Sequence, residues 1–372
     1  MISKITVLDL FCWCWGLSYW FSMSWYDVLL WIDNWKDCLD TFAYNHKNAK
    51  ILCADISKIG KDDVQNILWD KRIDIIVWWP PCQWFSLAWK RDSKDPRNKL
   101  VIDYVKIISE IRPKFFVMEN VLWLLSMKDE EWNLVIENLK NEFWKIWYNI
   151  NYKLLYAHNY WVPQKRWRVF IVWNNIWIDF KFPEIKNDWI KVPFVTVWDA
   201  ISDLPLLDND FWEEKTKYIQ NPKSEYQKFI RKDSQYIFNH TKSNRSEQTI
   251  KVINLVPEWW NRKDLPPEYQ NIRSFSNTRK RLDSKQPSVT IDTWHRHHFH
   301  YKANRVPTVR ESARIQSFPD WYEFQGRYTT GGPRRKLECP RYTQVGNAVP
   351  PLMAETLGRF IIELAESEIV YE

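Results

Sequence analysis

The sequence predicts an α/β protein with a doubly wound, mostly parallel sheet and an inserted irregular domain. Up to about residue 174, short β-branched runs alternate with longer amphipathic segments, an order typical of βαβ units. Prolines then interrupt a polar, weakly periodic stretch between about 180 and 300, and periodic helical patterns return after it. We therefore expect a first domain over 1–180, an inserted domain over 181–303, and a C-terminal segment, 304–372, that returns to the first sheet.

Short apolar runs give the strands and longer stripes give the helices. The predicted strands are Ile5–Phe11, Val28–Asp33, Ile51–Ile56, Ile73–Val77, Phe115–Val121, Tyr152–Ala157 and Arg168–Val172. The predicted helices are Asn98–Arg112, Glu130–Phe143, Thr308–Phe318 and Pro350–Leu364. Each helical segment repeats apolar residues at three- to four-residue spacing, as Val101, Val105 and Ile108 do in the first of them.

Composition indicates a globular protein with an acidic partner. The chain has 372 residues, 45% hydrophobic and 27% charged, and a net charge of +7 that suits a polyanion. Its six cysteines form no disulfide framework, and its first residues lead directly into a strand without a signal peptide. No apolar run approaches the roughly 18 residues of a membrane span, so we expect a cytoplasmic chain with reduced thiols.

Glycine is scarce and tryptophan is abundant. Average usage of about 7% would give roughly 26 glycines, but the chain has 7 glycines and 26 tryptophans. Several tryptophans stand where the local pattern calls for glycine. We interpret much of the excess as tryptophan in glycine positions.

Polar residues at predicted strand ends are the first candidates for a site. Asp33 ends the second strand and Asp55 lies near the end of the third, where each can be either a capping acid or an acceptor for a nucleoside. Cys82 follows an apolar strand and two prolines, and Glu119 lies in a later strand. A thiol and a carboxyl at neighbouring strand ends can attack and protonate the same small ring.

These motifs resemble those of the DNA cytosine-5 methyltransferases. The matching segments are Pro80-Pro81-Cys82-Gln83, Glu119-Asn120-Val121, Gln164-Lys165-Arg166-Trp167-Arg168, Arg310–Pro319 and Gln344–Pro351. The resemblance implies an S-adenosylmethionine-dependent methyltransferase fold that acts on double-stranded DNA. It also implies that Cys82 adds to carbon 6 of a flipped cytosine, that Glu119 protonates nitrogen 3, and that Arg166 and Arg168 hold the base and the adjoining phosphate.

The same resemblance assigns a cofactor site for S-adenosylmethionine. By the family's Phe-x-Gly-x-Gly-Gly turn, Phe11 flanks the adenine, and Trp13, Trp15 and Gly16 fill the glycine slots. Asp33 then accepts the ribose hydroxyls, Asp55 the adenine amino group, and Ile56 forms an apolar wall. Asn347 and Val349, from the last motif, complete the predicted site.

The resemblance further implies a monomeric modification enzyme with a cognate restriction endonuclease, in which the inserted domain reads the target sequence. We expect base contacts from Arg273–Arg281 and His295–Lys302, and phosphate contacts from the arginine-rich last third. The histidines of the second range lack the spacing of a zinc site, so we predict no metal. Two alternatives stay open: an RNA cytosine-5 methyltransferase, and a DNA-binding homologue whose Trp13 and Trp15 obstruct the cofactor turn.

Overall fold

The chain folds into two compact units in a computed structural model. The structure describes residues 5–14, 26–68, 71–79, 96–129, 131–182, 194–207, 213–242, 247–260, 264–270, 280–293 and 297–369. The first unit, here called the sheet unit, comprises Met1–Tyr156, Trp167–Glu184 and Ala354–Glu372. The second, the loop unit, comprises Ala157–Arg166 and Ile185–Met353. Each is described by itself below.

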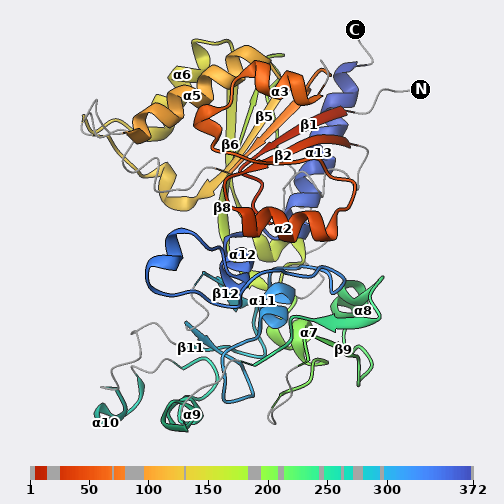
Figure 1. Ribbon diagram of the computed structural model, residues 1–372. Helices are drawn as coiled ribbons and strands as arrows, with labels where there is room; N and C mark the ends of the chain where they lie inside the picture. The colour runs from red at the N-terminus through yellow and green to blue at the C-terminus, as the bar shows by residue number, and fades with distance from the viewer. Residues whose placement is uncertain are drawn as a thin grey trace. The chain divides into compact units, whose positions relative to one another are not determined.

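A seven-stranded sheet organises the sheet unit (Figure 1). Its strands are β1 (Ile5–Leu10), β2 (Tyr26–Asp33), β3 (Ile51–Cys53), β4 (Ile75–Trp78), β5 (Phe115–Val121), β6 (Asn149–Tyr156) and β8 (Trp167–Asn174). They lie in the order β3-β2-β1-β4-β5-β8-β6, parallel except for β8, which is antiparallel to both of its neighbours. The strand order reverses between β1 and β4, which confirms the predicted doubly wound α/β fold.

The central strands are apolar because both faces of a parallel sheet are covered. All four residues of β4, Ile-Ile-Val-Trp, are buried, and its first residue, Ile75, pairs with Val7 of β1. The helices of this unit are α2 (Lys36–Asn45), α3 (Lys61–Leu68), α5 (Pro96–Ile111), α6 (Val135–Trp144) and α13 (Pro351–Ile369). Figure 1 shows α3, α5 and α6 on one side of the sheet and α13 on the other. The predicted helices over 98–112, 130–143 and 350–364 correspond to α5, α6 and α13.

The C-terminal helix is fastened to the first strands of the sheet unit. The Tyr26 hydroxyl of β2 donates a hydrogen bond to the Gly358 carbonyl (3.0 Å), and the Phe360 ring packs edge-on against Phe180. By packing, residues 354–372 belong to the sheet unit. Residues 304–353 belong to the loop unit by packing, and the limits of the DNA-reading domain stay a prediction.

The loop unit is built from short elements joined by irregular chain. Its helices are α7 (Val197–Ile201), α8 (Glu225–Arg231), α9 (Glu247–Asn254), α10 (Pro267–Gln270), α11 (Val309–Ile315) and α12 (Arg341–Asn347). Its strands are β7 (Gln164–Lys165), β9 (Lys215–Lys217), β10 (Tyr236–Phe238), β11 (Lys280–Arg281), β12 (Ser288–Val289) and β13 (His298–Phe299), which form three two-stranded pairs. The predicted helix over 308–318 is α11, which begins with a reciprocal capping box between Thr308 and Glu311.

Across the part of the chain that the structure describes, no helix is long and apolar enough to cross a membrane.

Candidate active site

The predicted catalytic and cofactor residues of the sheet unit gather at one edge of its sheet. Strands β2, β1, β4 and β5 are parallel neighbours, so their carboxyl ends meet at the same edge. Asp33 ends β2, Phe11 follows β1, and Glu119 lies two residues before the end of β5. Ligands bind at this edge in open α/β sheets, at the point where the strand order reverses. Cys82, Trp15 and Gly16 lie outside the described residues.

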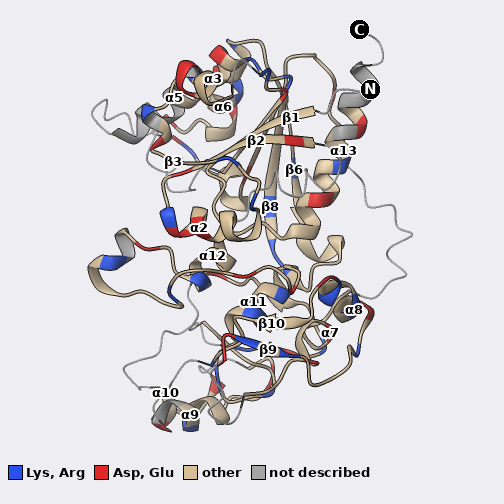
Figure 2. Ribbon diagram, turned by 45° about the vertical axis from the view of Figure 1, so that its right-hand side comes forward, with Lys and Arg blue, Asp and Glu red and all other residues tan. Residues whose placement is uncertain are grey.

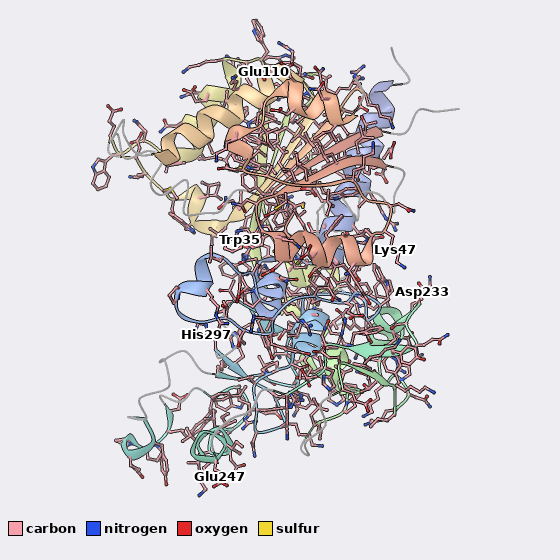
Figure 3. The ribbon with its side chains drawn as sticks, viewed as in Figure 1. Trp35, Lys47, Glu110, Asp233, Glu247 and His297 are labelled. Carbon is pink, nitrogen blue, oxygen red and sulfur yellow. The ribbon has the colours of Figure 1, made fainter. Side chains whose placement is uncertain are left out.

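Asp33 organises the turn that follows β1. Its Oδ2 accepts a hydrogen bond from the Trp13 backbone N–H (2.9 Å), and its Oδ1 accepts one from the Trp35 N–H (2.8 Å), at the start of α2 (Figure 3). Burial raises the pKa of this carboxyl to about 6, although the bonds from Trp35, Trp13 and Asn34 oppose the rise. Each carboxylate oxygen has a second lone pair, so Asp33 is a fixed acceptor with remaining capacity.

The turn has left-handed backbone at two positions. Phe11 has φ 61° and Trp13 has φ 52°, a conformation that a bulky L-residue rarely adopts. The glycine slot predicted at position 13 therefore has the backbone that favours glycine. Phe11 is buried, whereas Trp13 is partly exposed.

The third predicted group lies beyond β3. The Ala54 N–H donates to the Asp33 carbonyl (2.9 Å), which ties the end of β3 to the end of β2. Ile56 is buried at the start of a short 3₁₀ turn (Ile56–Lys58), and the Asp55 side chain is exposed. A fixed acid, an apolar wall and an exposed acid fit the polar and apolar parts of a nucleoside. Trp13 is the residue of this set whose side chain does not fit.

Glu119 is paired with Arg168 across two antiparallel strands. The Arg168 Nε lies 2.6 Å from the Glu119 Oε1, and both side chains are largely shielded from water. The register of β5 and β8 places Arg168 opposite Val121, which is two residues beyond Glu119 and therefore on the same face of the sheet. The Arg168 Nη1 also donates to the Trp167 carbonyl (2.7 Å). The carboxylate is thus held in one orientation by a charge-assisted contact.

Arg166 belongs to the loop unit and has a different environment. Its side chain is 2% exposed, and its terminal nitrogens donate to the carbonyls of Ile291 and Gly346, each at 3.0 Å. With both terminal nitrogens bonded to main chain, Arg166 acts here as a positioning residue. This geometry does not support the predicted contact of Arg166 with the base or phosphate.

Asn347 and Val349 end the segment that Arg166 holds. Asn347 is the last residue of α12 and Val349 is buried, both within the loop unit. Their predicted contact with the cofactor stays a prediction.

Several residues predicted to contact DNA are instead internal. Arg281 and His300 are buried, and Arg310 and Arg314 are fully so, which excludes them from phosphate contact in this conformation. Arg281 donates to carbonyls, including those of His300 (2.8 Å) and Ala303 (3.1 Å), and the His300 Nδ1 accepts from the Lys302 and Ala303 N–H groups. Burial lowers the pKa of His300 to about 3, so its ring is neutral. The other candidates within 271–279 and 294–296 lie outside the described residues.

Sequence reasoning missed the acids that pair with these arginines. Arg314 binds both Asp320, through Nε (2.9 Å) and Nη2 (2.6 Å), and Asp203. Arg305 makes a two-pronged contact with Glu311, at 2.7 Å for each bond. The Thr308–Glu311 capping spacing was the available signal for Glu311, whereas Asp203 lies more than a hundred residues away from Arg314.

Among the residues that the structure describes, no group of three or more histidines, cysteines or acids could hold a metal ion. His297 bonds Asp292 through Nδ1, and the His298 Nε2 lies 3.2 Å from the Thr290 carbonyl. Their contacts are those of separate polar side chains.

Comparison with known proteins gives one consistent result. Residues 5–363 match the family model for C-5 cytosine-specific DNA methylases. The Type II methyltransferase M.DdeI of Desulfomicrobium norvegicum is 34% identical over 376 residues, covering 96% of this chain and 88% of the relative. The Type II methyltransferase M1.HphI of Haemophilus parahaemolyticus is 29% identical, covering 98% and 88%.

Solved structures share the fold. A DNA modification methyltransferase encoded within an Escherichia coli prophage superposes with a TM-score of 0.76 at 22% identity, covering 98% of this chain and 100% of that one. The Dnmt2 methyltransferase of S. pombe gives a TM-score of 0.56 at 14% identity, covering 97% and 99%.

Proposed function

Because the chain belongs to the C-5 cytosine-specific DNA methylase family, we propose that it methylates carbon 5 of a cytosine in a specific duplex sequence, with Cys82 and Glu119 as its catalytic residues. Cytosine is unreactive at carbon 5 until a nucleophile adds to carbon 6. A thiolate suits this step because it is strongly nucleophilic and also leaves readily.

The proposed chemistry divides between two side chains. The Cys82 thiolate forms a bond to carbon 6 while Glu119 gives a proton to nitrogen 3, which leaves an electron-rich enamine at carbon 5. After carbon 5 has been methylated, a general base removes the proton from carbon 5, the double bond between carbons 5 and 6 re-forms as Cys82 departs as thiolate, and nitrogen 3 returns its proton to Glu119. Inside a duplex the cytosine ring is stacked and out of reach of Cys82, so the target nucleotide must first rotate out of the DNA helix.

The Glu119–Arg168 pair is the observation that carries this proposal. Glu119 is only 7% exposed, lies near the carboxyl end of β5, and is fixed by Arg168 at 2.6 Å. Trp78 at the end of β4 pairs with Met118, so the chain that leads to Cys82 starts beside Glu119. We propose that Arg168 positions Glu119. Arg166, in turn, positions the segment around Gly346.

S-adenosylmethionine is the methyl donor that the family implies, and it supplies an electrophilic methyl group when bound. Asp33 would hold the ribose hydroxyls, Asp55 the adenine amino group, and Phe11 and Ile56 would flank the ring. The raised pKa of Asp33, to about 6, leaves the carboxylate ionised at neutral pH, which suits an acceptor of two hydroxyl protons. Trp13 and Trp15 would hinder this binding, and Asn347 and Val349 are proposed to complete the site.

We also propose partners for the reaction. Duplex DNA is the substrate, and the names of the Type II relatives support a restriction endonuclease that recognises the same sequence. A cytoplasmic monomer is the proposed working form. The impaired DNA-binding homologue is the second candidate function, favoured by the left-handed backbone at Trp13.

A covalent trap tests the catalytic assignment. Duplex DNA containing 5-fluorocytosine blocks the final elimination, so the chain should accumulate as a denaturation-resistant adduct in the presence of S-adenosylmethionine. The experiment is run on this chain and on its Trp13→Gly, Trp15→Gly variant, each with and without Cys82→Ser. We expect adduct in the double-glycine background and none with Cys82→Ser. An adduct that survives Cys82→Ser removes the nucleophile assignment, and no adduct despite calorimetrically proven cofactor and DNA binding favours the impaired homologue.

A further inference from the structure

Tryptophan occupies an unusual number of left-handed backbone positions. Of the twelve non-glycine residues with positive φ in the described chain, six are tryptophan: Trp13, Trp132, Trp147, Trp161, Trp177 and Trp259, with φ from 52° to 70°. Only a few per cent of non-glycine residues adopt this conformation, and asparagine and aspartate are the enriched types. Asp233 and Asn239 in the same set are of those types. A bulky side chain has no such reason to be there.

Trp147 stands at a helix end that normally uses glycine. After α6, the Tyr148 N–H donates to the Phe143 carbonyl (3.0 Å), and the Trp147 N–H donates to the Trp144 carbonyl (2.9 Å). These two bonds, with φ 70° at Trp147, form a Schellman motif. The residue in the left-handed position of that motif is usually glycine, because it carries no Cβ penalty.

Trp132 occupies a tight turn with the same requirement. The chain reverses between Asp129 and Asn133, where the Asp129 N–H donates to the Asn133 carbonyl (2.9 Å) and Lys128 bridges Leu134 in antiparallel pairing. The Asp129 Oδ1 accepts from the Asn133 N–H (2.9 Å), which fixes the turn. Trp132, with φ 66°, is 74% exposed, and its indole makes one cation–π contact, with Lys128 (5.0 Å to the ring centre), so burial of the indole does not explain why it is there.

At three of the remaining positions the turn is closed by hydrogen bonds that need no indole, although the Trp177 ring contacts Trp144 and the Trp161 ring contacts Tyr226 and Phe229. The Trp13 N–H binds the Asp33 carboxylate (2.9 Å), and the Trp259 N–H donates to the Arg281 carbonyl (3.1 Å). Trp177 lies in the turn after β8, within a loop closed by the Ile178 N–H on the Asn174 Oδ1 (3.1 Å). A glycine would keep every one of these bonds.

Buried indoles give a second, independent sign. Within the described residues, the Nε1 atoms of Trp31, Trp79 and Trp173 are buried without a hydrogen-bond partner. Buried indole N–H groups usually find a partner, and an unsatisfied donor is costly. Trp31 and Trp173 lie in strands β2 and β8, and Trp79 directly follows β4.

We propose that the protein made by its own cell carries glycine at positions 13, 132, 147, 161, 177 and 259. One codon of the gene, which is translated as tryptophan in this sequence, would be decoded as glycine by that cell. At these six positions alone the change raises the glycine count from 7 to 13, lowers the tryptophan count from 26 to 20, and accounts for the left-handed backbone. It also removes the misfit at position 13 of the cofactor turn, since that position is among the six. The proposal concerns the residues themselves and stands apart from the assignment of the reaction.

Peptide sequencing of the natural protein tests this directly. The protein is purified from the organism that carries the gene, digested, and its peptides are sequenced by tandem mass spectrometry. We expect glycine at the six positions, unchanged masses for peptides that contain no tryptophan, and one shared codon, other than UGG, at the six positions in the gene. Tryptophan in the peptide that spans residue 147 would overturn the proposal.

A stability pair made in a host that inserts tryptophan gives a second test. Trp147→Gly should raise the thermal midpoint by about 2–4 °C, because it relieves a left-handed residue. Trp144→Gly is the matched control: it lies in the last turn of the same helix, is similarly exposed (54% against 66%), and has no positive φ. That control should lower the midpoint, because glycine weakens a helix. If Trp147→Gly lowers the midpoint as much as Trp144→Gly does, position 147 is not built for glycine.

Discussion

The sheet unit and the loop unit satisfy their polar groups by opposite means. In the sheet unit, the strand ladder pairs the main chain; β4 has no charged residue, β1 and β5 have one each, and Figure 2 draws the strands of this sheet mostly in tan. In the loop unit, buried arginine side chains donate hydrogen bonds to main-chain carbonyls that no strand or helix pairs. Arg281 donates to four carbonyls and to the Asn304 side chain, and Arg310 donates to the carbonyls of Phe238, Pro319 and Tyr322.

This difference follows from the main chain. Irregular segments leave carbonyl groups inside the fold that no strand or helix can pair, and each unpaired one costs free energy. A guanidinium has five donors in a fixed fork, so one side chain can satisfy several carbonyls from different loops. Arg281, Arg310 and Arg314 therefore have a structural role in the loop unit, whereas phosphate binding by the exposed arginines of the last third, such as Arg327, stays a prediction.

The largest effect should come from removing Arg314. Burial lowers its pKa, but Asp320 and Asp203 outweigh this, and the resulting pKa is raised above its ordinary value. Arg314→Met removes the nearest cation from two buried carboxylates, although Asp203 keeps Arg231 (3.1 Å) and Asp320 keeps Arg310 (3.8 Å). The free energy of unfolding should therefore fall by about 3 kcal/mol, the low end for a broken buried ion pair. Urea unfolding of both forms measures it.

Arg359→Met is the control for Arg314, because its side chain is mostly exposed and pairs with Glu355 one turn away on the same helix. A surface pair of this kind is worth at most about 1 kcal/mol. Equal losses from the two substitutions would contradict the role of Arg314 as an internal connector.

The same contrast explains what the sequence could predict. The strand ends at Asp33 and Val121 and the helix over 98–112 were predictable, because period and alternation report burial in regular structure. In the loop unit the relevant partners are distant in the chain: Arg314 with Asp203, or Arg166 with Gly346. Local pattern carries no information about such contacts, so the motif arginines were assigned to ligands. Position 13 was predicted to need glycine, and its φ of 52° agrees.

The second prediction concerns the close approach at Gly346. A Cβ there would lie 2.3 Å from the Asp292 carbonyl oxygen, so Gly346→Ala must push two backbone segments apart. We expect a loss of about 1–3 kcal/mol in the free energy of unfolding, since overpacking strains both segments. Denaturant titration gives the value. Gly331→Ala is the control, because nothing lies within 4 Å of its Cβ position and its φ is not left-handed. If the two alanine variants are equally stable, the main chain at Gly346 does not pack as closely against Asp292 as the structure shows.

The smallest predicted effect separates the two units by pH. Burial lowers the pKa of His240 in the loop unit to about 4, whereas burial raises that of Asp33 in the sheet unit to about 6. Between pH 7 and 5.5 the unfolded chain takes up a proton at His240 and the folded chain does not, so this histidine costs about 1.4 kcal/mol of stability at pH 5.5. Asp33 acts with the opposite sign: its folded form begins to bind a proton first, which adds on the order of 1 kcal/mol.

Two variants isolate these contributions, because His46 in the sheet unit, with a pKa lowered by burial to about 3, also affects the unmodified chain. On going from pH 7 to 5.5, His240→Gln should lose less stability than the unmodified chain, and Asp33→Asn should lose more. Urea midpoints at the two pH values measure both differences. Since each comparison is made within one variant, a constant cost of the substitution cancels. If the two variants lose the same stability between pH 7 and 5.5, burial does not shift the pKa values of His240 and Asp33 in the directions given above.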